Sequence, residues 1–151
     1  IIIDEDLGGD GGPVDLEVAV SEIDDALNNT LFDGEPLRTR VDLIAEGSRI
    51  RGADDVFKLV GLGANAVGLS TAMLIALDYG ERFQSRFDPE KTRENLECFF
   101  LGLQKEIKLL AGSAGVSSIQ TSLIGGRELF RAVDMDPAVR RRLKVKHGGE
   151  G

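Results

Sequence analysis

Clustered glycines are the residues of this 151-residue sequence whose type and spacing first indicate chemistry. The sequence has 19 glycines, about twice the number expected from an average usage of ~7%. They gather at Gly8 to Gly12, at Gly47 and Gly52, and from Gly61 to Gly68. Because glycine permits positive φ and close approach of the backbone to a ligand, clusters that follow strands indicate loops that cradle phosphate. The alternative is that each cluster is only a turn.

The hydrophobic pattern places these clusters after strands of an α/β fold. Buried strands are predicted from Ile1 to Asp4, over 41–45 and over 65–69. Each is followed by a helix-like stretch, the first with one apolar stripe and the second with acidic residues at its start. Ser70 and Thr71 are expected to cap the third helix. Three successive strand–loop–helix units predict parallel strands with crossover helices.

Beyond Asp78 the pattern predicts helices alone. Asp88-Pro89 and Asp136-Pro137 each combine an N-cap residue with a proline at the first helical position. Cys98 lies inside the first of these helices and is interpreted as a reduced, partly buried thiol. The basic tail that follows either lies at a helix C-terminus or contacts an acidic partner; its members are Arg140, Arg141, Arg142, Lys144 and Lys146.

Composition excludes several classes of protein. A net charge of −8 disfavours nucleic acid and anionic membranes as partners. One cysteine excludes an internal disulfide framework and a cysteine-based zinc site, so no metal ligands are assigned. One histidine, His147, leaves little scope for a Ser-His-Asp triad. No apolar run approaches the roughly 18 residues of a membrane span, and we expect a cytoplasmic protein.

Three segments together resemble the glutamate synthase family. The stretch IIIDEDLGGDGGP (1–13) is similar to the strand and Gly-Gly-x-Gly loop of the family's flavin domain. Residues 40–77 are similar to the final two strands of its FMN-binding (β/α)8 TIM barrel, and residues 106–130 resemble its closing segment. The resemblance implies an α/β fold in which residues 1–77 form the last strands and helices of the barrel. Residues 78–151 would form a helical C-terminal extension.

The resemblance also implies an FMN site at the strand ends. In TIM-barrel enzymes, phosphate often lies on the loops after the last two strands, where backbone N–H groups and a helix N-terminus point at it. Ser48 stands where the family usually has a second glycine, and Arg49 or Arg51 could add positive charge. The flavin-binding residues implied are Gly8, Gly9, Gly47, Ser48, Arg49, Gly68, Ser70 and Thr71.

The function implied is that of a portion or subunit of an FMN-dependent oxidoreductase. Its reaction would be the reductive amination of 2-oxoglutarate, or a related amine transfer with a glutamate-type substrate. The family's iron–sulfur cysteines have no counterpart in residues 76–84, so cluster ligation by this chain is not expected. The family's earlier strands are also absent. We therefore expect the chain to need the remainder of the barrel, within an oligomer or multi-subunit complex.

Two alternatives stay open. The chain could be a non-catalytic structural subunit that completes a flavin-binding barrel, because half a barrel leaves sheet edges uncovered. It could instead be a nucleotide-binding dehydrogenase of the inosine monophosphate type, since the loops of residues 40–77 are similar in that family and in type 2 isopentenyl diphosphate isomerase. No catalytic cysteine loop of the dehydrogenase is visible here.

Overall fold

A parallel three-stranded sheet organises the first half of the chain. The computed structural model describes residues 1–6, 15–79 and 88–149. The sheet has the order β1 (Ile2–Asp4), β4 (Ile44–Glu46) and β5 (Ala66–Val67). β1 pairs in parallel with β4, and β4 pairs in parallel with β5. The predicted parallel arrangement is confirmed, and the loops that follow the three strands start from one edge of the sheet.

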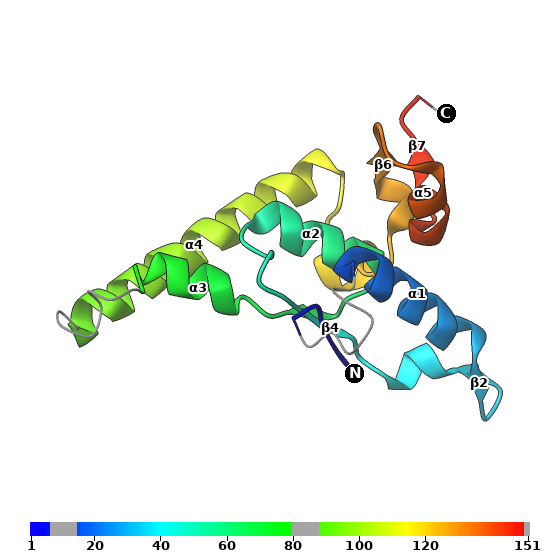
Figure 1. The fold of residues 1–151 in the computed structure, drawn as a ribbon, viewed down its shortest axis with the longest axis horizontal. Coiled ribbons are helices and arrows are strands. Elements are labelled where there is room, and N and C mark those ends of the chain that lie inside the picture. Colours follow the sequence, from blue (N-terminus) through cyan, green and yellow to red (C-terminus); the bar gives the residue numbers. More distant parts are fainter. Residues whose placement is uncertain (7–14, 80–87, 150–151) are drawn as a thin grey trace.

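A helix follows each strand, as predicted. They are α1 (Leu16–Asn29), α2 (Ala53–Leu62) and α3 (Ser70–Ala76) (Figure 1). α1 begins where the Asp15 carboxylate accepts the N–H of Val18, and α2 ends at Gly63, whose φ of +130° favours glycine. The apolar faces of α1 and α2 bury the core against the sheet; its buried residues are Ile3, Leu16, Val18, Val20, Ala45, Ile50, Leu59, Leu62, Ala64 and Leu143.

The longest helix, α4 (Pro89–Ser113), begins at the predicted cap, where the Asp88 carboxylate accepts the N–H groups of Glu90 and Lys91. It runs past α2 and beside α3 (Figure 1). Its C-terminal end packs against Phe57 and Val60 of α2. Of its residues, all of which are described, only Ala111 is buried. Most of this helix therefore presents its surface to solvent.

The C-terminal segment packs back onto α1. It contains the π-helical turn η2 (Ile119–Leu123), the 3-10 turn η3 (Arg127–Leu129) and α5 (Pro137–Leu143), which begins at the predicted Asp136 cap. Arg142 pairs with Glu22 of α1, and Lys144 pairs with Asp25. The expectation of helices alone was wrong, because β6 (Arg131–Ala132) pairs in parallel with β7 (Lys146–His147). The basic tail lies at the C-terminal end of α5, one of the two placements expected for it.

Three local expectations need correction. Residues 41–43 lie outside β4, because side chains bind their backbone groups: Arg38 Nη1 donates to the Val41 carbonyl, and Asn65 Oδ1 accepts the Leu43 N–H. α3 begins at Ser70 after Leu69, and no side-chain hydrogen bond caps it. Cys98 is exposed rather than partly buried. A short hairpin, β2 (Leu31–Phe32) with β3 (Glu35–Pro36), turns at Asp33-Gly34, and the 3-10 turn η1 (Leu37–Arg40) follows it.

One buried carboxylate joins most of these elements. Asp24 of α1 accepts a hydrogen bond of 2.7 Å from Arg38 Nε of η1 and one of 2.9 Å from Arg127 Nη2 of η3. The Asp24 side chain is 8% exposed, and both arginine side chains are 12% exposed. Arg38 also donates to the Gly63 carbonyl, and Arg127 donates to the Leu62 carbonyl. The pair of arginines thus ties η1 and η3 to the ends of α1 and α2.

We expect Asp24→Ala to destabilise the protein by roughly 3–5 kcal/mol, because it leaves the buried Arg38 without its carboxylate partner and leaves Arg127 with Asp25 alone. The measurement is the urea midpoint of the purified protein, converted to a free energy of unfolding. Glu97→Ala is the control: it breaks the exposed Arg93–Glu97 pair on α4 and should cost no more than about 0.5 kcal/mol. Equal losses in the two variants would contradict the role given to Asp24.

Candidate functional site

The loop after β4 meets the end of β1 through two carboxylates. Residues 47–49 follow β4, and Glu5 and Asp6 follow β1. Because β1 and β4 are parallel neighbours, both loops leave the same edge of the sheet, where ligands of parallel sheets commonly bind. The Glu5 N–H extends the pairing by donating to the Glu46 carbonyl at 3.1 Å. This register brings the Glu5 and Asp6 side chains onto residues 47–49.

Glu5 is buried beneath this loop. Its carboxylate accepts the backbone N–H of Arg49 at 3.0 Å and Arg49 Nε at 2.9 Å, while Arg49 Nη2 lies 2.8 Å away. The hydrogen bond from the Arg49 side chain holds the pKa of the Glu5 carboxyl below its ordinary value of 4.5. A Cβ on Gly47 would lie 2.5 Å from Glu5 Cγ, so Gly47 must be glycine for the Glu5 side chain to fit.

Asp6 binds the next residue of the same loop. One of its carboxylate oxygens accepts the backbone N–H of Ser48 at 2.9 Å, and the other accepts the Ser48 hydroxyl at 3.0 Å. The Asp6 N–H in turn donates to Asp4 Oδ1 at 2.8 Å. Unlike Glu5, Asp6 is exposed. The successive N–H groups of Ser48 and Arg49 therefore each hold a carboxylate oxygen.

The third loop, residues 68–71, continues from β5 into α3. The Gly68 N–H donates to the Ala45 carbonyl at 2.8 Å, so it extends the sheet. A Cβ on Gly68 would lie 3.0 Å from Glu46 Cγ, which leaves little room for any side chain. Ser70 and Thr71 form the first turn of α3. Gly8 and Gly9, which were also assigned to the flavin, lie outside the described residues.

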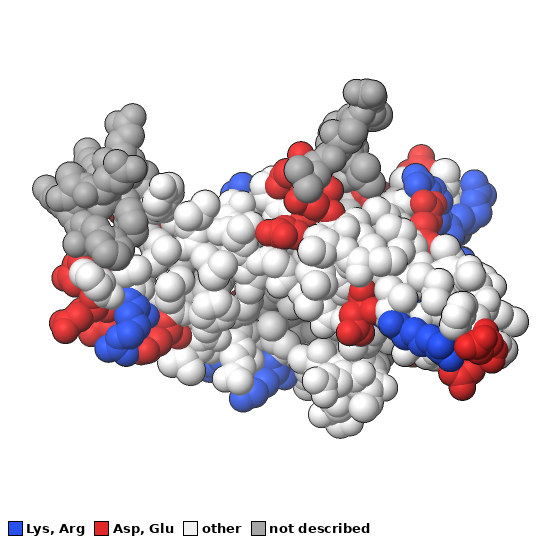
Figure 2. Space-filling model, turned by 90° about the horizontal axis from the view of Figure 1, so that it is seen from below, with Lys and Arg blue, Asp and Glu red and all other residues white. Residues whose placement is uncertain are grey.

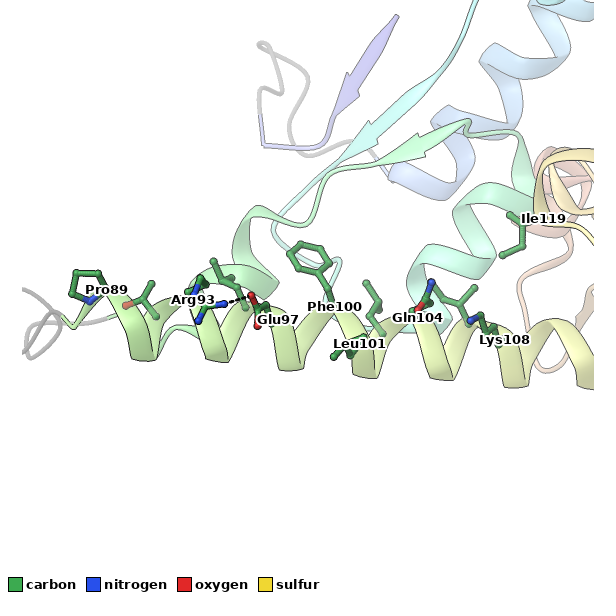
Figure 3. A pocket seen from close by; sticks show the side chains of 12 residues that line it. Pro89, Arg93, Glu97, Phe100, Leu101, Gln104, Lys108 and Ile119 are labelled. Carbon is green, nitrogen blue, oxygen red and sulfur yellow. Dashed lines mark hydrogen bonds and ion pairs between the residues drawn. The ribbon is translucent and has the colours of Figure 1, made fainter.

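Glu5 and Arg49 line hollows at this edge of the sheet. A hollow of about 390 Å³ includes Arg49 but is otherwise lined by residues outside the three strand-end loops, among them Lys58, Met135 and Leu143. The one lined by Glu5, Arg49 and Ile50 has a volume of about 70 Å³, whereas pockets for small molecules hold roughly 300–1,000 Å³. A larger hollow of about 1070 Å³ runs along α4, and no residue of the three strand-end loops lines it. Figure 3 shows Phe100 rising from α4 into this hollow, beside the Arg93–Glu97 ion pair. Hence the described strand-end residues form part of a site rather than an enclosed pocket.

The described residues contain neither a membrane-spanning helix nor a metal-binding cluster. No described helix is both long and apolar enough to cross a membrane. Within residues 1–6, 15–79 and 88–149, histidine, cysteine, aspartate and glutamate side chains do not come together in threes that could hold a metal ion.

Glu5 and Asp6 are the site residues that the sequence interpretation missed. The sequence pattern predicts a strand from Ile1 to Asp4 and assigns no role to the two acidic residues after it. A signal was present: an acidic pair directly after a buried strand must lie at the edge where the neighbouring parallel strand also ends. The structure joins Gly47, Ser48 and Arg49 to this pair, and it places Arg49 on a carboxylate.

Comparison with known proteins points to one family. Residues 9–80 match the family model described as the conserved region in glutamate synthase. The archaeal glutamate synthase [NADPH] of Methanocaldococcus jannaschii is 31% identical, over 99% of this chain and 33% of its own length. The archaeal-type glutamate synthases [NADPH] of Dehalococcoides mccartyi and Thermotoga maritima are 30% and 28% identical, over 91% and 99% of this chain. No solved structure matches.

The chain spans about a third of the length of these relatives. The alignment with the Methanocaldococcus jannaschii protein covers 177 positions, whereas this chain has 151 residues. At least 26 aligned positions, the difference between the two numbers, therefore have no residue in this chain. The relatives therefore carry residues within this region that this sequence lacks.

We expect Glu5→Gln to destabilise the protein by about 1 kcal/mol at pH 7, because the neutral amide loses the charge-assisted bonds to Arg49. Since folding lowers the pKa of Glu5, its stabilisation is complete above the ordinary value of 4.5 and is lost as pH falls through the lower folded value. The gap in free energy of unfolding between parent and variant should thus close in acid. Exposed Glu128→Gln is the control, and a gap that stays constant from pH 7 to 3 would refute the assignment.

Proposed function

This chain belongs to a glutamate synthase-like family, and from that premise we propose that it is one portion of an FMN-dependent oxidoreductase. Its reaction would be the reductive amination of 2-oxoglutarate or a related amine transfer. The observation that carries the proposal is the similarity of 91–99% of the chain to glutamate synthases. That similarity favours this proposal over an inosine monophosphate-type dehydrogenase.

Residues 1–77 would supply the last strands and helices of a (β/α)8 barrel, and residues 78–151 would extend it. The parallel order β1-β4-β5 with a helix after each strand supports this assignment. Both outer strands of the described sheet have an unpaired edge, and Ile1 and Ile2 at one of them are 57% and 64% exposed. Such edges require further strands.

The remainder of the barrel is the partner that these surfaces fit. About two thirds of the relatives' length has no counterpart in this chain. The hollow along α4 is lined mainly by apolar side chains, among them Leu96, Phe100 and Leu101. Figure 2, seen from below, shows a broad stretch with few charged side chains between the charged groups of the two ends. A polypeptide equivalent to the relatives' missing part would cover the open edges and this hollow.

The residues at the strand ends fit the phosphate of FMN by their donor set. Consecutive N–H groups at Ser48 and Arg49 already hold carboxylate oxygens, so the loop is built to bind anions. We assign the phosphate to Gly47, Ser48, Ser70 and Thr71, with Arg49 nearby. In its reduced form, bound FMN would supply hydride to the imine of the substrate. The chain's own residues would fix the phosphate and leave room for it at Gly68.

One observation favours the non-catalytic alternative. Glu5 and Asp6 occupy the donors of Ser48 and Arg49, and both carry the same sign of charge as phosphate. If these carboxylates hold their places in the whole protein, the chain completes a barrel without binding the cofactor. Flavin absorbance of the purified native assembly separates the two functions, since a colourless protein that rejects added FMN supports the structural role.

The chain expressed alone is expected to associate or aggregate, because its sheet edges and the hollow along α4 are uncovered. Light scattering over a range of protein concentrations would show it. A dilute monomer with a sharp, reversible unfolding transition is the contrary result.

Gly68→Asp should weaken FMN binding roughly a hundredfold, because it adds a side chain and a negative charge where the phosphate is assigned. Flavin fluorescence of the native assembly measures the affinity. Gly68→Ala separates the causes: its Cβ meets Glu46 in the same way but brings no charge. Lys58→Ala on α2 should leave the affinity nearly intact. Parent-like affinity in Gly68→Asp would place the phosphate elsewhere.

A further inference from the structure

The backbone N–H and the hydroxyl of Ser48 are arranged as in an anion-binding site. The anion that they bind is the carboxylate of Asp6, a residue of the same chain. A backbone N–H at 2.9 Å and a hydroxyl at 3.0 Å converge on the Asp6 carboxylate. These distances are those of charge-assisted hydrogen bonds, and a phosphate accepts the same pair of donors. The adjacent Arg49 N–H is held in the same manner by Glu5. Two successive backbone amides that bind anions form a concave nest.

We propose that Asp6 is an internal competitor for the donors of Ser48, and that it sets the affinity of this loop for phosphate-bearing ligands. The inference rests on the proposed FMN site and names the residue that tunes it. When a phosphate binds, the Asp6 carboxylate leaves the Ser48 N–H and hydroxyl and returns to water. The number of hydrogen bonds at Ser48 is then unchanged, and one anion has replaced another.

Asp6 rather than Glu5 is the carboxylate that yields. The Glu5 side chain is 5% exposed, is bonded to the backbone and side chain of Arg49, and fills the space that a Cβ on Gly47 would need. Moving the Glu5 side chain away would leave the tightly packed space beside Gly47 empty. Asp6 is exposed, and its two bonds to Ser48 are exposed as well. A carboxylate at such a position regains full hydration when it is displaced, so the exchange costs little.

Glu5 and Asp6 differ in how their charges are compensated. Glu5 stays next to the incoming phosphate, and Arg49 compensates its charge. Among the described residues Asp6 has no such cation: its bonds are to Ser48 and, through its own N–H, to Asp4. Asp6 therefore opposes phosphate binding in two ways: it occupies the donors of Ser48, and its negative charge repels the phosphate. Neutralising it removes both effects, and we expect phosphate-bearing ligands to bind about tenfold more tightly.

The test uses Asp6→Asn in the native assembly, with inorganic phosphate and FMN as separate probes. Calorimetry measures the affinity for phosphate, and flavin fluorescence measures the affinity for FMN. Asp134→Asn is the matched control: it removes one charge from an exposed residue that is far along the chain and whose φ of +52° suits asparagine equally. Asp6→Ala serves as a second variant, and circular dichroism verifies that each variant is folded.

Tighter phosphate binding in Asp6→Asn and Asp6→Ala, with Asp134→Asn like the parent, supports the inference. Adding Ser48→Ala to Asp6→Asn should then lower the gain, because one of the two donors is gone. Equal phosphate affinity in parent, Asp6→Asn and Asp6→Ala overturns it. If phosphate binding tightens but FMN fails to bind to any form, the competition at Ser48 stands and the proposed flavin function falls. If FMN and phosphate each bind equally to all forms, the flavin function stands and the competition falls.

Discussion

The fold depends on a single buried carboxylate. Asp24 lies between Arg38 and Arg127, and each arginine also donates to a backbone carbonyl at the end of α2. Arg127 pairs with Asp25 as well, at 2.6 Å, whereas Asp24 is the carboxylate that Arg38 pairs with among the described residues. Without Asp24, Arg38 would be a buried cation with no carboxylate partner, which is costly. Even so, Arg127 Nε is buried without a hydrogen-bond partner among the described residues. A Cβ on Gly63 would lie 2.6 Å from Asp24 Cγ, so the end of α2 is shaped to admit this group.

Features coded by neighbouring residues could be predicted from the sequence. The Asp88-Pro89 and Asp136-Pro137 caps, the end of α2 at Gly63 and the parallel order of three strands all follow from local patterns of charge, glycine and hydrophobicity. Contacts between distant residues could not be predicted this way. Arg127 and Asp24 are 103 positions apart, and Glu5 and Arg49 are 44 apart. The paired strands β6 and β7 have two residues each, too few to show a period of two.

For the candidate site, the sequence predicts where the loops lie more fully than what they bind. Glycines after β4 and β5 are expected at one edge of the sheet, because parallel strands deliver their loops to one side, and the strands are parallel. What the residue types could not show is that this loop already binds the chain's own carboxylates. The sequence does not show whether the N–H of Ser48 binds the Asp6 carboxylate or a phosphate. The choice depends on register, which places Asp4 opposite Glu46 and so carries the next two residues over Ser48 and Arg49.

The return of the C-terminal segment onto α1 governs the order in which the chain can fold. Ser21 Oγ donates to the carbonyls of Arg142 and Leu143, 121 and 122 positions further along, and Leu143 belongs to the same core as Leu16. Contacts of such high sequence separation slow folding, since the loop between them must close first. A ribosome adds roughly 5–20 residues per second. The first helix is therefore made seconds before the residues that complete its packing, and the part of its surface that Arg142 and Leu143 cover stays open to chaperones and proteases until the last turn of α5 has left the ribosome.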